Sequence, residues 1–260
     1  MLRPRLIPCL LLQNKGVVKT TQFKNPIYVG DPINTVRLFN DKNVDELLIL
    51  DIDATRKNIE PDYNFIKKLA NECRMPLCYG GGIKDLNQIN KIINLGIEKV
   101  SLSNTAFTNP NLLKTASKYI GSQSIVVTLD IKKTKPFGDY FIFTHNGTKR
   151  ISRFSKNILK NFEDKGIGEI VINIINRDGR MDGYDYDFIS KVRMHTSLPI
   201  TFLGGAGSLE DIQKLWHKFG IVGAAAGSIF IFKGKYKAVL INYPSIDEKY
   251  SLINNAGLNK

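Results

Sequence analysis

Two glycine clusters are the clearest candidates for chemistry in this sequence. Gly80–Gly82 and Gly204–Gly207 each follow a short apolar run and precede an amphipathic stretch. A glycine-rich turn lets backbone N–H groups approach a phosphate closely, and the N-terminus of a following helix adds a favourable dipole. Two such turns predict a substrate with a phosphate at each end, although glycines that merely permit tight turns are the alternative. The predicted phosphate-binding positions are Gly81, Gly82, Asn104, Asp178, Gly179, Gly204, Gly205, Gly207, Gly227 and Ser228. For Asp178, which precedes Gly179, formation of a turn is an equal alternative.

Asp130 is the candidate for acid–base chemistry. It ends an apolar run and is followed by Ile131 and Lys132, so its carboxylate stands at the end of a predicted strand. A carboxylate there can act as a general acid or base if its pKa is tuned, and a helix cap or a salt bridge to Lys132 is the alternative. The three histidines fall in a predicted hairpin and in helical segments, so no histidine-centred catalytic triad is indicated.

Four charged residues stand at the opposite ends of the predicted strands. Each lies just before or at the start of an apolar run, and they comprise two cations and two anions: Arg5, Glu46, Lys99 and Glu169. Taken alone, these positions favour an ordinary network of salt bridges that closes one end of the fold.

Short apolar runs alternate with longer amphipathic stretches along the whole chain. The runs lack strict polar–apolar alternation, as expected for strands buried on both faces of a parallel sheet. They span residues 6–12, 46–52, 76–79, 98–102, 124–130, 169–175, 199–203 and 222–226. The predicted helices include residues 32–43, 61–73, 84–95, 110–119, 153–165, 184–195 and 208–219. Together they predict an α/β fold of the (β/α)8 TIM-barrel type, with a doubly wound open sheet as the alternative.

An internal repeat divides the predicted barrel into two halves. A shift of 123 residues superimposes Glu46 on Glu169, Pro76 on Pro199 and Gly81-Gly82 on Gly204-Gly205. Four parallel strands with open edges cannot close alone, so both halves must share one barrel. We predict a single domain over residues 1–260, with homologous half-barrels at approximately 1–122 and 123–240 and a C-terminal tail at 241–260.

Two segments depart from the regular pattern. Residues 134–150 contain an Asn-Gly pair after an apolar stretch, which predicts a hairpin on the rim that carries the functional groups. The segment after Lys233 is expected to be helical at first and then polar.

The composition limits the class of protein and its partners. The chain is 43% hydrophobic and 23% charged, which is typical of a soluble globular protein. A net charge of +13 suits a phosphorylated small molecule, a nucleic acid or an acidic partner, and no aromatic-studded basic motif supports a nucleic acid. Three cysteines cannot form a disulfide framework and indicate a reducing compartment, and no metal or other cofactor is predicted. No apolar run approaches the roughly 20 residues that cross a bilayer, so we expect a cytoplasmic protein.

In order and together, these features resemble the cyclase (HisF-type) subunit of imidazole glycerol phosphate synthase from histidine biosynthesis. The matching stretches include Gly16-Val-Val-Lys19, Gly30-Asp-Pro32, Asp45-Glu-Leu47, Gly80-Gly-Gly-Ile83, Lys99-Val-Ser101, Asp130, Gly168-Glu169, Arg177-Asp-Gly179, Gly204-Gly-Ala-Gly207 and Ser228-Ile-Phe230. The resemblance implies a lyase that forms a heterodimer with a glutaminase (HisH-type) subunit and receives ammonia from it. In that family, ammonia adds to a bisphosphorylated aminoimidazole-carboxamide ribonucleotide, which is split to imidazole glycerol phosphate and the aminoimidazole ribotide.

The resemblance also implies roles for individual residues. The four charged residues match the family's ammonia gate at the barrel floor, and the glycine clusters match its two phosphate sites. Asp130 and Lys19 match catalytic positions. Leu11, however, occupies the place of the family's first catalytic aspartate, and a leucine cannot move a proton. Ser103, Asn104, Asn173 and Leu203 also replace residues usual in the family's substrate site.

Three hypotheses follow from this pattern. The chain is an active cyclase subunit that relies on Asp130 with Lys19. Alternatively, it conducts ammonia to another acceptor, as HisF-like proteins of surface-polysaccharide gene clusters are thought to do for a third, sugar-amidating enzyme. As a third alternative, it is a non-catalytic scaffold that activates the glutaminase. Each general acid–base group contributes roughly 10²–10⁴ in rate, so the chemistry favours the second hypothesis slightly, whereas the family resemblance favours the first.

Overall fold

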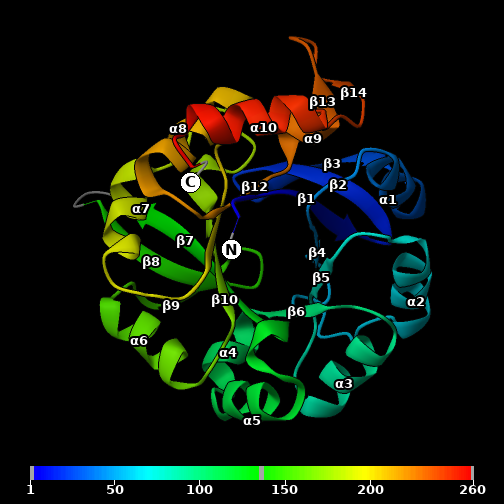
Figure 1. Ribbon diagram of the computed structural model, residues 1–260. Coiled ribbons are helices and arrows are strands. Elements are labelled where there is room, and N and C mark those ends of the chain that lie inside the picture. Colours follow the sequence, from blue (N-terminus) through cyan, green and yellow to red (C-terminus); the bar gives the residue numbers. More distant parts are fainter. Residues whose placement is uncertain (1–2, 135–137, 259–260) are drawn as a thin grey trace.

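A closed barrel of eight parallel strands forms the centre of the protein (Figure 1). The computed structural model describes residues 3–134 and 138–258. The barrel strands follow one another in chain order: β1 (Arg5–Gln13), β4 (Leu47–Asp51), β5 (Leu77–Gly80), β6 (Lys99–Leu102), β7 (Ile125–Thr134), β10 (Glu169–Ile174), β11 (Ile200–Leu203) and β12 (Gly223–Ala226). The parallel pairing of β12 with β1 completes the circle. The predicted TIM barrel is therefore confirmed.

Helices surround the barrel on its outside (Figure 1). They are α1 (Pro32–Asp41), α2 (Tyr63–Glu72), α3 (Leu86–Asn94), α5 (Asn111–Ile120), α6 (Lys156–Asp164), α7 (Tyr186–Arg193) and α8 (Leu209–Phe219). Short helical turns are α4 (Asn104–Thr108), α9 (Ser228–Ile231), η1 (Ser122–Ser124) and η2 (Ile175–Arg177). Four of the long helices begin in the same way, with an aspartate that accepts the N–H three residues on: Asp31, Asp62, Asp85 and Asp185. Such caps satisfy N–H groups that the helix itself leaves free.

Two antiparallel hairpins extend the first and the fifth barrel strands. The hairpin predicted at residues 134–150 is confirmed, since β8 (Asp139–Thr144) and β9 (Lys149–Arg153) continue from β7. A second hairpin, β2 (Gly16–Thr21) and β3 (Lys24–Gly30), continues from β1 in the same way. The two hairpins follow strands that lie four positions apart, which supports the hypothesis of two related halves.

The chain after the last barrel strand differs from the expectation. Residues after Lys233 do not begin a helix: β13 (Phe232–Lys233) and β14 (Ala238–Val239) form a small hairpin instead. Gly234 and Lys237 adopt positive φ angles of 72° and 51°, which a helix does not accommodate. A helix, α10 (Ile246–Asn255), follows later and packs against α8. Within the described ranges, none of the helices has the length and apolar character needed to cross a membrane.

The barrel interior holds its own apolar cluster, separate from the larger core between strands and helices. Alternate residues of each strand point inward, and those inside include Ile7, Cys9, Leu11, Leu48, Cys78, Val126, Val171, Leu203 and Ala225. The interior between the two ends of the strands is thus lined mainly by apolar side chains.

Candidate active site

Two adjoining cavities open at the rim of the barrel, where the strands end, and contain most of the predicted site residues. The first cavity is lined by Gly81, Gly82, Asn104 and Asp130, among others. The second cavity is lined by Lys19, Asp178, Gly179, Gly204, Gly205, Gly227 and Ser228, among others. Leu11 and Asn173 line both. The site is therefore elongated, with one glycine cluster at each end and these two side chains between them.

Glycines at the cavity walls leave room for backbone at one position and for a side chain at another. Gly81 has a φ of 128°, and a Cβ there would lie 2.6 Å from the carbonyl oxygen of Asp51. A Cβ on Gly227 would lie 2.1 Å from the Lys19 ammonium nitrogen. Both contacts are far closer than van der Waals packing permits, so a side chain at either position would displace a wall of the cavity.

Gly207 does not belong to either cavity. Its N–H donates to the Asp211 carboxylate (2.9 Å), which is part of the capping box of α8. A Cβ on Gly207 would lie 2.2 Å from the carbonyl oxygen of Met181. Because the N–H of Gly207 is already used and the position is packed, the predicted role of Gly207 in phosphate binding is not supported.

Lys19 places a buried ammonium group at the second cavity. Its Nζ donates to the carbonyl oxygen of Cys9 (2.7 Å), and within the described parts of the chain it makes no ion pair. Burial lowers the pKa of Lys19, and the nearby Asp178 opposes this shift. A buried ammonium without a carboxylate partner is costly, and an anionic ligand group in the second cavity would relieve that cost.

Asp178 also lies at the second cavity but has structural partners. It accepts hydrogen bonds from the Thr20 hydroxyl (2.7 Å) and the N–H of Phe23 (3.2 Å). Burial raises its pKa, although these hydrogen bonds oppose the shift. Asp178 therefore ties the β2–β3 hairpin to the rim beside the cavity.

The environment of the predicted acid–base group Asp130 suits proton transfer near neutral pH. Burial raises its pKa to about 7, with a further contribution from Asp178 and an opposing hydrogen bond from Asn173. The Asn173 Nδ2 donates to Asp130 Oδ1 (3.1 Å), because the two residues are paired neighbours on β7 and β10. A carboxyl group with a pKa near the operating pH can act as either acid or base.

Two asparagine oxygens at these cavities have no hydrogen-bond partner within the described structure: Asn104 Oδ1 and Asn173 Oδ1. Asn173 is only 3% exposed, and its amide nitrogen already faces Asp130. Buried acceptors without donors are uncommon in folded proteins. The two oxygens are therefore suited to receive N–H or O–H groups of a ligand.

Sequence reasoning missed several residues that line the first cavity: Phe23, Thr128, His145 and Asn146. Thr128 lies two residues before Asp130 on β7, so period-two alternation was the signal that placed it inward. Phe23 and the histidine–asparagine pair come from the turns of the two rim hairpins, and only the pairing of those hairpins brings them over the cavity. Asp51 also lines it, and its Oδ1 accepts the N–H groups of Asp53 and Ala54, which makes it a turn-forming group.

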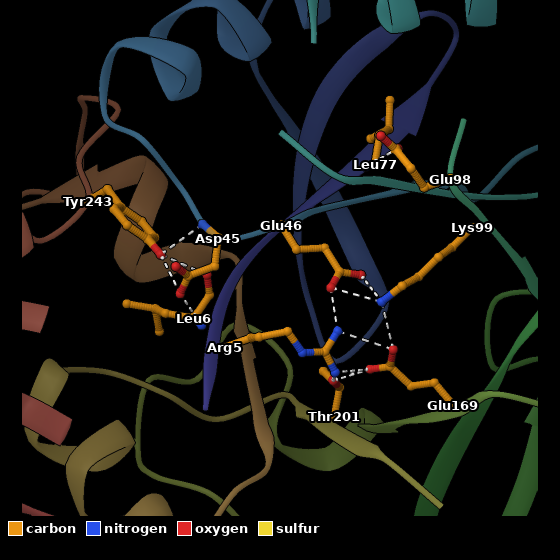
Figure 2. A network of polar contacts seen from close by, with 10 residues as sticks. All are labelled: Arg5, Leu6, Asp45, Glu46, Leu77, Glu98, Lys99, Glu169, Thr201 and Tyr243. Carbon is orange, nitrogen blue, oxygen red and sulfur yellow. Dashed lines mark hydrogen bonds and ion pairs between the residues drawn. The ribbon is translucent and has the colours of Figure 1, made fainter. Parts of the chain in front are cut away.

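At the floor, where the strands begin, the four charged residues form a closed ring (Figure 2). Arg5 pairs with Glu46 and with Glu169 (2.7 Å), and Lys99 pairs with Glu46 (2.8 Å) and Glu169 (2.9 Å). The Thr201 hydroxyl donates to Glu169 (2.6 Å). Although burial opposes it, the two carboxylates raise the pKa of Lys99, and the two cations lower the pKa of Glu169. We call this set of Arg5, Glu46, Lys99 and Glu169 the four-residue ring.

Directly above the four-residue ring lies a small cavity of about 10 Å³, on the order of the space one water molecule needs. Its walls combine the two ring carboxylates with Thr201 and inward-facing apolar groups: Ile7, Leu48, Cys78, Val126 and Val171. Since both carboxylates are already paired with Arg5 and Lys99, a small neutral molecule suits such walls better than an ion does.

The pKa of Asp130 has a consequence for stability. The folded pKa of about 7 lies above the ordinary value of 3.8, so this group contributes most to stability below about pH 4. Its contribution should decline as the pH rises from about 4 to about 7, by as much as about 4 kcal/mol. The Asp130→Asn variant cannot titrate there, so its free energy of unfolding in urea should lack this decline. Parallel pH dependence in both proteins would contradict the raised pKa.

Residues 5–237 match the family model described as histidine biosynthesis protein. The chain is 52% identical over 252 residues to a Leptospira borgpetersenii protein provisionally named imidazole glycerol phosphate synthase subunit HisF, covering 97% of this chain and 99% of the relative. It is 54% identical over 250 residues to the provisionally named hisF3 subunit of Vibrio vulnificus, covering 96% of each. Identity to the imidazole glycerol phosphate synthase subunit HisF of Natranaerobius thermophilus is 35% over 245 residues, covering 94% of this chain and 97% of the relative.

Proposed function

Since this chain belongs to the histidine biosynthesis protein family, as a divergent paralogue among the HisF subunits of imidazole glycerol phosphate synthase, we propose that it is the ammonia-using subunit of a glutamine amidotransferase complex. A HisH-type glutaminase would dock on the floor and form the heterodimer. The observation that carries this proposal is the placement of the four-residue ring and the two rim cavities at opposite ends of one apolar barrel interior. Ammonia would enter at the ring and react at the rim.

The lining of the barrel interior supports passage of ammonia rather than ammonium. The inward-facing groups between the two ends are mostly apolar, and an ion would lose its hydration there without compensation. The ring closes the floor with paired charges, so one of its cations must move aside for ammonia to pass. Lys99 is the more flexible of the two cations, with a single ammonium on a long stem.

The rim cavities support an acceptor phosphorylated at both ends. We assign Gly81, Gly82 and Asn104 to one end, and Lys19, Gly179, Gly204, Gly205, Gly227 and Ser228 to the other. Asp178 lies beside the second group but holds the β2–β3 hairpin instead of a phosphate. Lys19 supplies charge to its phosphate, and the glycines permit close approach of the backbone. Asp130 then moves protons at the middle of the acceptor, with Asn173 holding the carboxylate. The first candidate acceptor is the bisphosphorylated aminoimidazole-carboxamide ribonucleotide.

A second candidate function has a specific observation in its favour. Leu11 and Leu203, both buried, face the cavities where acid–base chemistry would need polar groups. Ammonia arriving at such a centre would be passed to a different acceptor, for example through a third, sugar-amidating enzyme docked on the rim.

The test is a reconstituted reaction. The purified chain, a HisH-type glutaminase, glutamine and the bisphosphorylated ribonucleotide are combined, and imidazole glycerol phosphate is measured by chromatography. Slow but Asp130-dependent formation supports the first candidate. Complex formation and glutamine hydrolysis without any imidazole product support the second, and failure to bind the glutaminase would exclude both.

A further inference from the structure

A second polar network lies beside the four-residue ring and involves a residue far along the chain (Figure 2). The Tyr243 hydroxyl donates to the carbonyl oxygen of Leu6 (2.8 Å) and accepts from the N–H of Asp45 (3.4 Å). The Asp45 carboxylate in turn accepts the N–H of Leu6 (2.9 Å). Leu6 directly follows the ring residue Arg5, and Asp45 directly precedes the ring residue Glu46.

This network lies at a place where backbone pairing between two barrel strands has ended. The paired register of β1 and β4 begins at Cys9 with Leu48. Continued toward the floor, the same register puts Leu6 opposite Asp45, yet their contact is made through a carboxylate and a tyrosine hydroxyl. The spacing of the two strand ends that carry Arg5 and Glu46 therefore depends on side chains.

Tyr243 is itself firmly held. Its ring packs against Phe230, with centroids 5.4 Å apart. Lys249 of α10 lies over the same ring and pairs with the Asp45 carboxylate (2.5 Å). Burial and the Asp45 carboxylate raise the pKa of Tyr243, so its hydroxyl keeps the proton that it donates. Tyr243 and Lys249 both lie beyond residue 237, where the match to the family model ends.

We infer that Tyr243 is a positioning residue for the four-residue ring, which sets the separation of Arg5 and Glu46 by joining the starts of β1 and β4. This inference rests on the proposed function of the ring as the entrance for ammonia. The C-terminal segment thereby becomes part of the entrance, although it contributes no group to the ring itself.

The chain alone provides the first test. Tyr243→Phe removes the hydroxyl but keeps the ring packing, and Tyr236→Phe is the matched control because Tyr236 is 85% exposed. Loss of one such hydrogen bond is expected to speed local hydrogen exchange at Leu6 by about tenfold. Exchange in residues 125–131, on the far side of the barrel, should stay unchanged. Unchanged exchange at Leu6 overturns the inference.

The second test asks whether the contact of Tyr243 with Leu6 and Asp45 affects the use of ammonia that the glutaminase delivers. With a HisH-type glutaminase and the bisphosphorylated ribonucleotide, product formation is compared between glutamine and added ammonium as nitrogen source. The inference predicts that Tyr243→Phe lowers the glutamine-driven rate several-fold and leaves the ammonium-driven rate near that of the unmodified protein. An equal fall in both rates indicates a purely structural role and overturns it.

Two further measurements distinguish failure of the inference about Tyr243 from failure of the proposed cyclase function. Lys249→Met removes the ion pair that holds Asp45 but leaves Tyr243 in place. It should therefore speed hydrogen exchange at Leu6 and lower the ratio of the glutamine-driven to the ammonium-driven rate, each to a smaller extent than Tyr243→Phe does. It decides the inference if Tyr243→Phe does not fold. If the unmodified protein forms no product from either nitrogen source, the proposed cyclase function fails, while the exchange experiment still decides whether Tyr243 fixes the strand ends.

Discussion

Replacing Leu11 with aspartate is expected to raise the rate of imidazole glycerol phosphate formation by roughly 10²–10⁴-fold, the usual contribution of one general acid–base group. Leu11 lines both rim cavities, and Asp130 lines the first of them. A carboxylate at position 11 would supply the proton transfer that a leucine cannot. Initial rates with saturating ammonium and the bisphosphorylated ribonucleotide measure the effect without requiring the glutaminase.

The matched control is Leu11→Asn, which has nearly the shape of aspartate but does not titrate in this pH range. It should remain as slow as the unmodified protein. If the asparagine variant gains as much as the aspartate variant, the gain comes from polarity or space rather than from proton transfer. Full turnover by the unmodified protein would contradict the altered reaction centre outright.

Asp130→Asn is expected to have the second large effect, a loss of roughly 10²–10⁴-fold in whatever product formation the unmodified protein shows. Asn173 and the asparagine at position 130 can still form a hydrogen bond, so the cavity should keep its shape. Docking of the glutaminase on the floor should be unaffected, because Asp130 stands at the opposite end of the strands. Rates and glutaminase affinity are measured on the same preparations.

Asp62→Asn serves as the control for Asp130→Asn, since Asp62 caps α2 on the outside of the barrel. The control should keep its activity. If Asp130→Asn abolishes product while docking persists, the scaffold hypothesis is discarded. If Asp130→Asn forms product at the unmodified rate, Asp130 is not the acid–base group, and the account of the rim cavities is wrong.

The barrel could be predicted from the sequence because each of its strands is buried on both faces. Such strands appear as continuous apolar runs, and β10 is buried at every position. The β8–β9 hairpin was also predictable, since Asn146 and Gly147 adopt the positive φ angles that such a turn demands. The β2–β3 hairpin turns at Gln22 and Phe23, which also have positive φ angles, of 53° and 63°, and these residue types give no turn signal.

The C-terminal tail, residues 241–260, could be predicted less well from the sequence. The helix α10 begins with a capping box between Ser245 and Glu248, a spacing that is recognisable in a sequence. Its apolar face is short, with Leu252 and Ile253 as its buried residues, so periodicity alone did not reveal it. The contact of Tyr243 with Leu6 spans 237 positions, and no local pattern predicts such a contact.

Within the candidate site, the charges and glycines could be predicted from their positions at strand ends, because parallel strands of a barrel share one rim and one floor. The relation of Asn173 to Asp130 could not, since it depends on the register between β7 and β10. Among the residues that the structure describes, that register also leaves Asn173 Oδ1 without a hydrogen-bond partner at the junction of the two cavities. Pairwise geometry of this kind exists only once the barrel has closed.

The most direct measurement of the central claim follows the nitrogen atom itself. Glutamine labelled with heavy nitrogen in its side-chain amide is supplied to the complex of the Leu11→Asp protein with a HisH-type glutaminase. The solution contains a large excess of unlabelled ammonium, at a pH where little of that ammonium is present as free ammonia. Mass spectrometry then gives the label in imidazole glycerol phosphate. Passage from the four-residue ring through the barrel predicts product that retains most of the heavy label. Label diluted to the proportion in the surrounding solution would show that ammonia reaches the rim from outside, and would contradict the account.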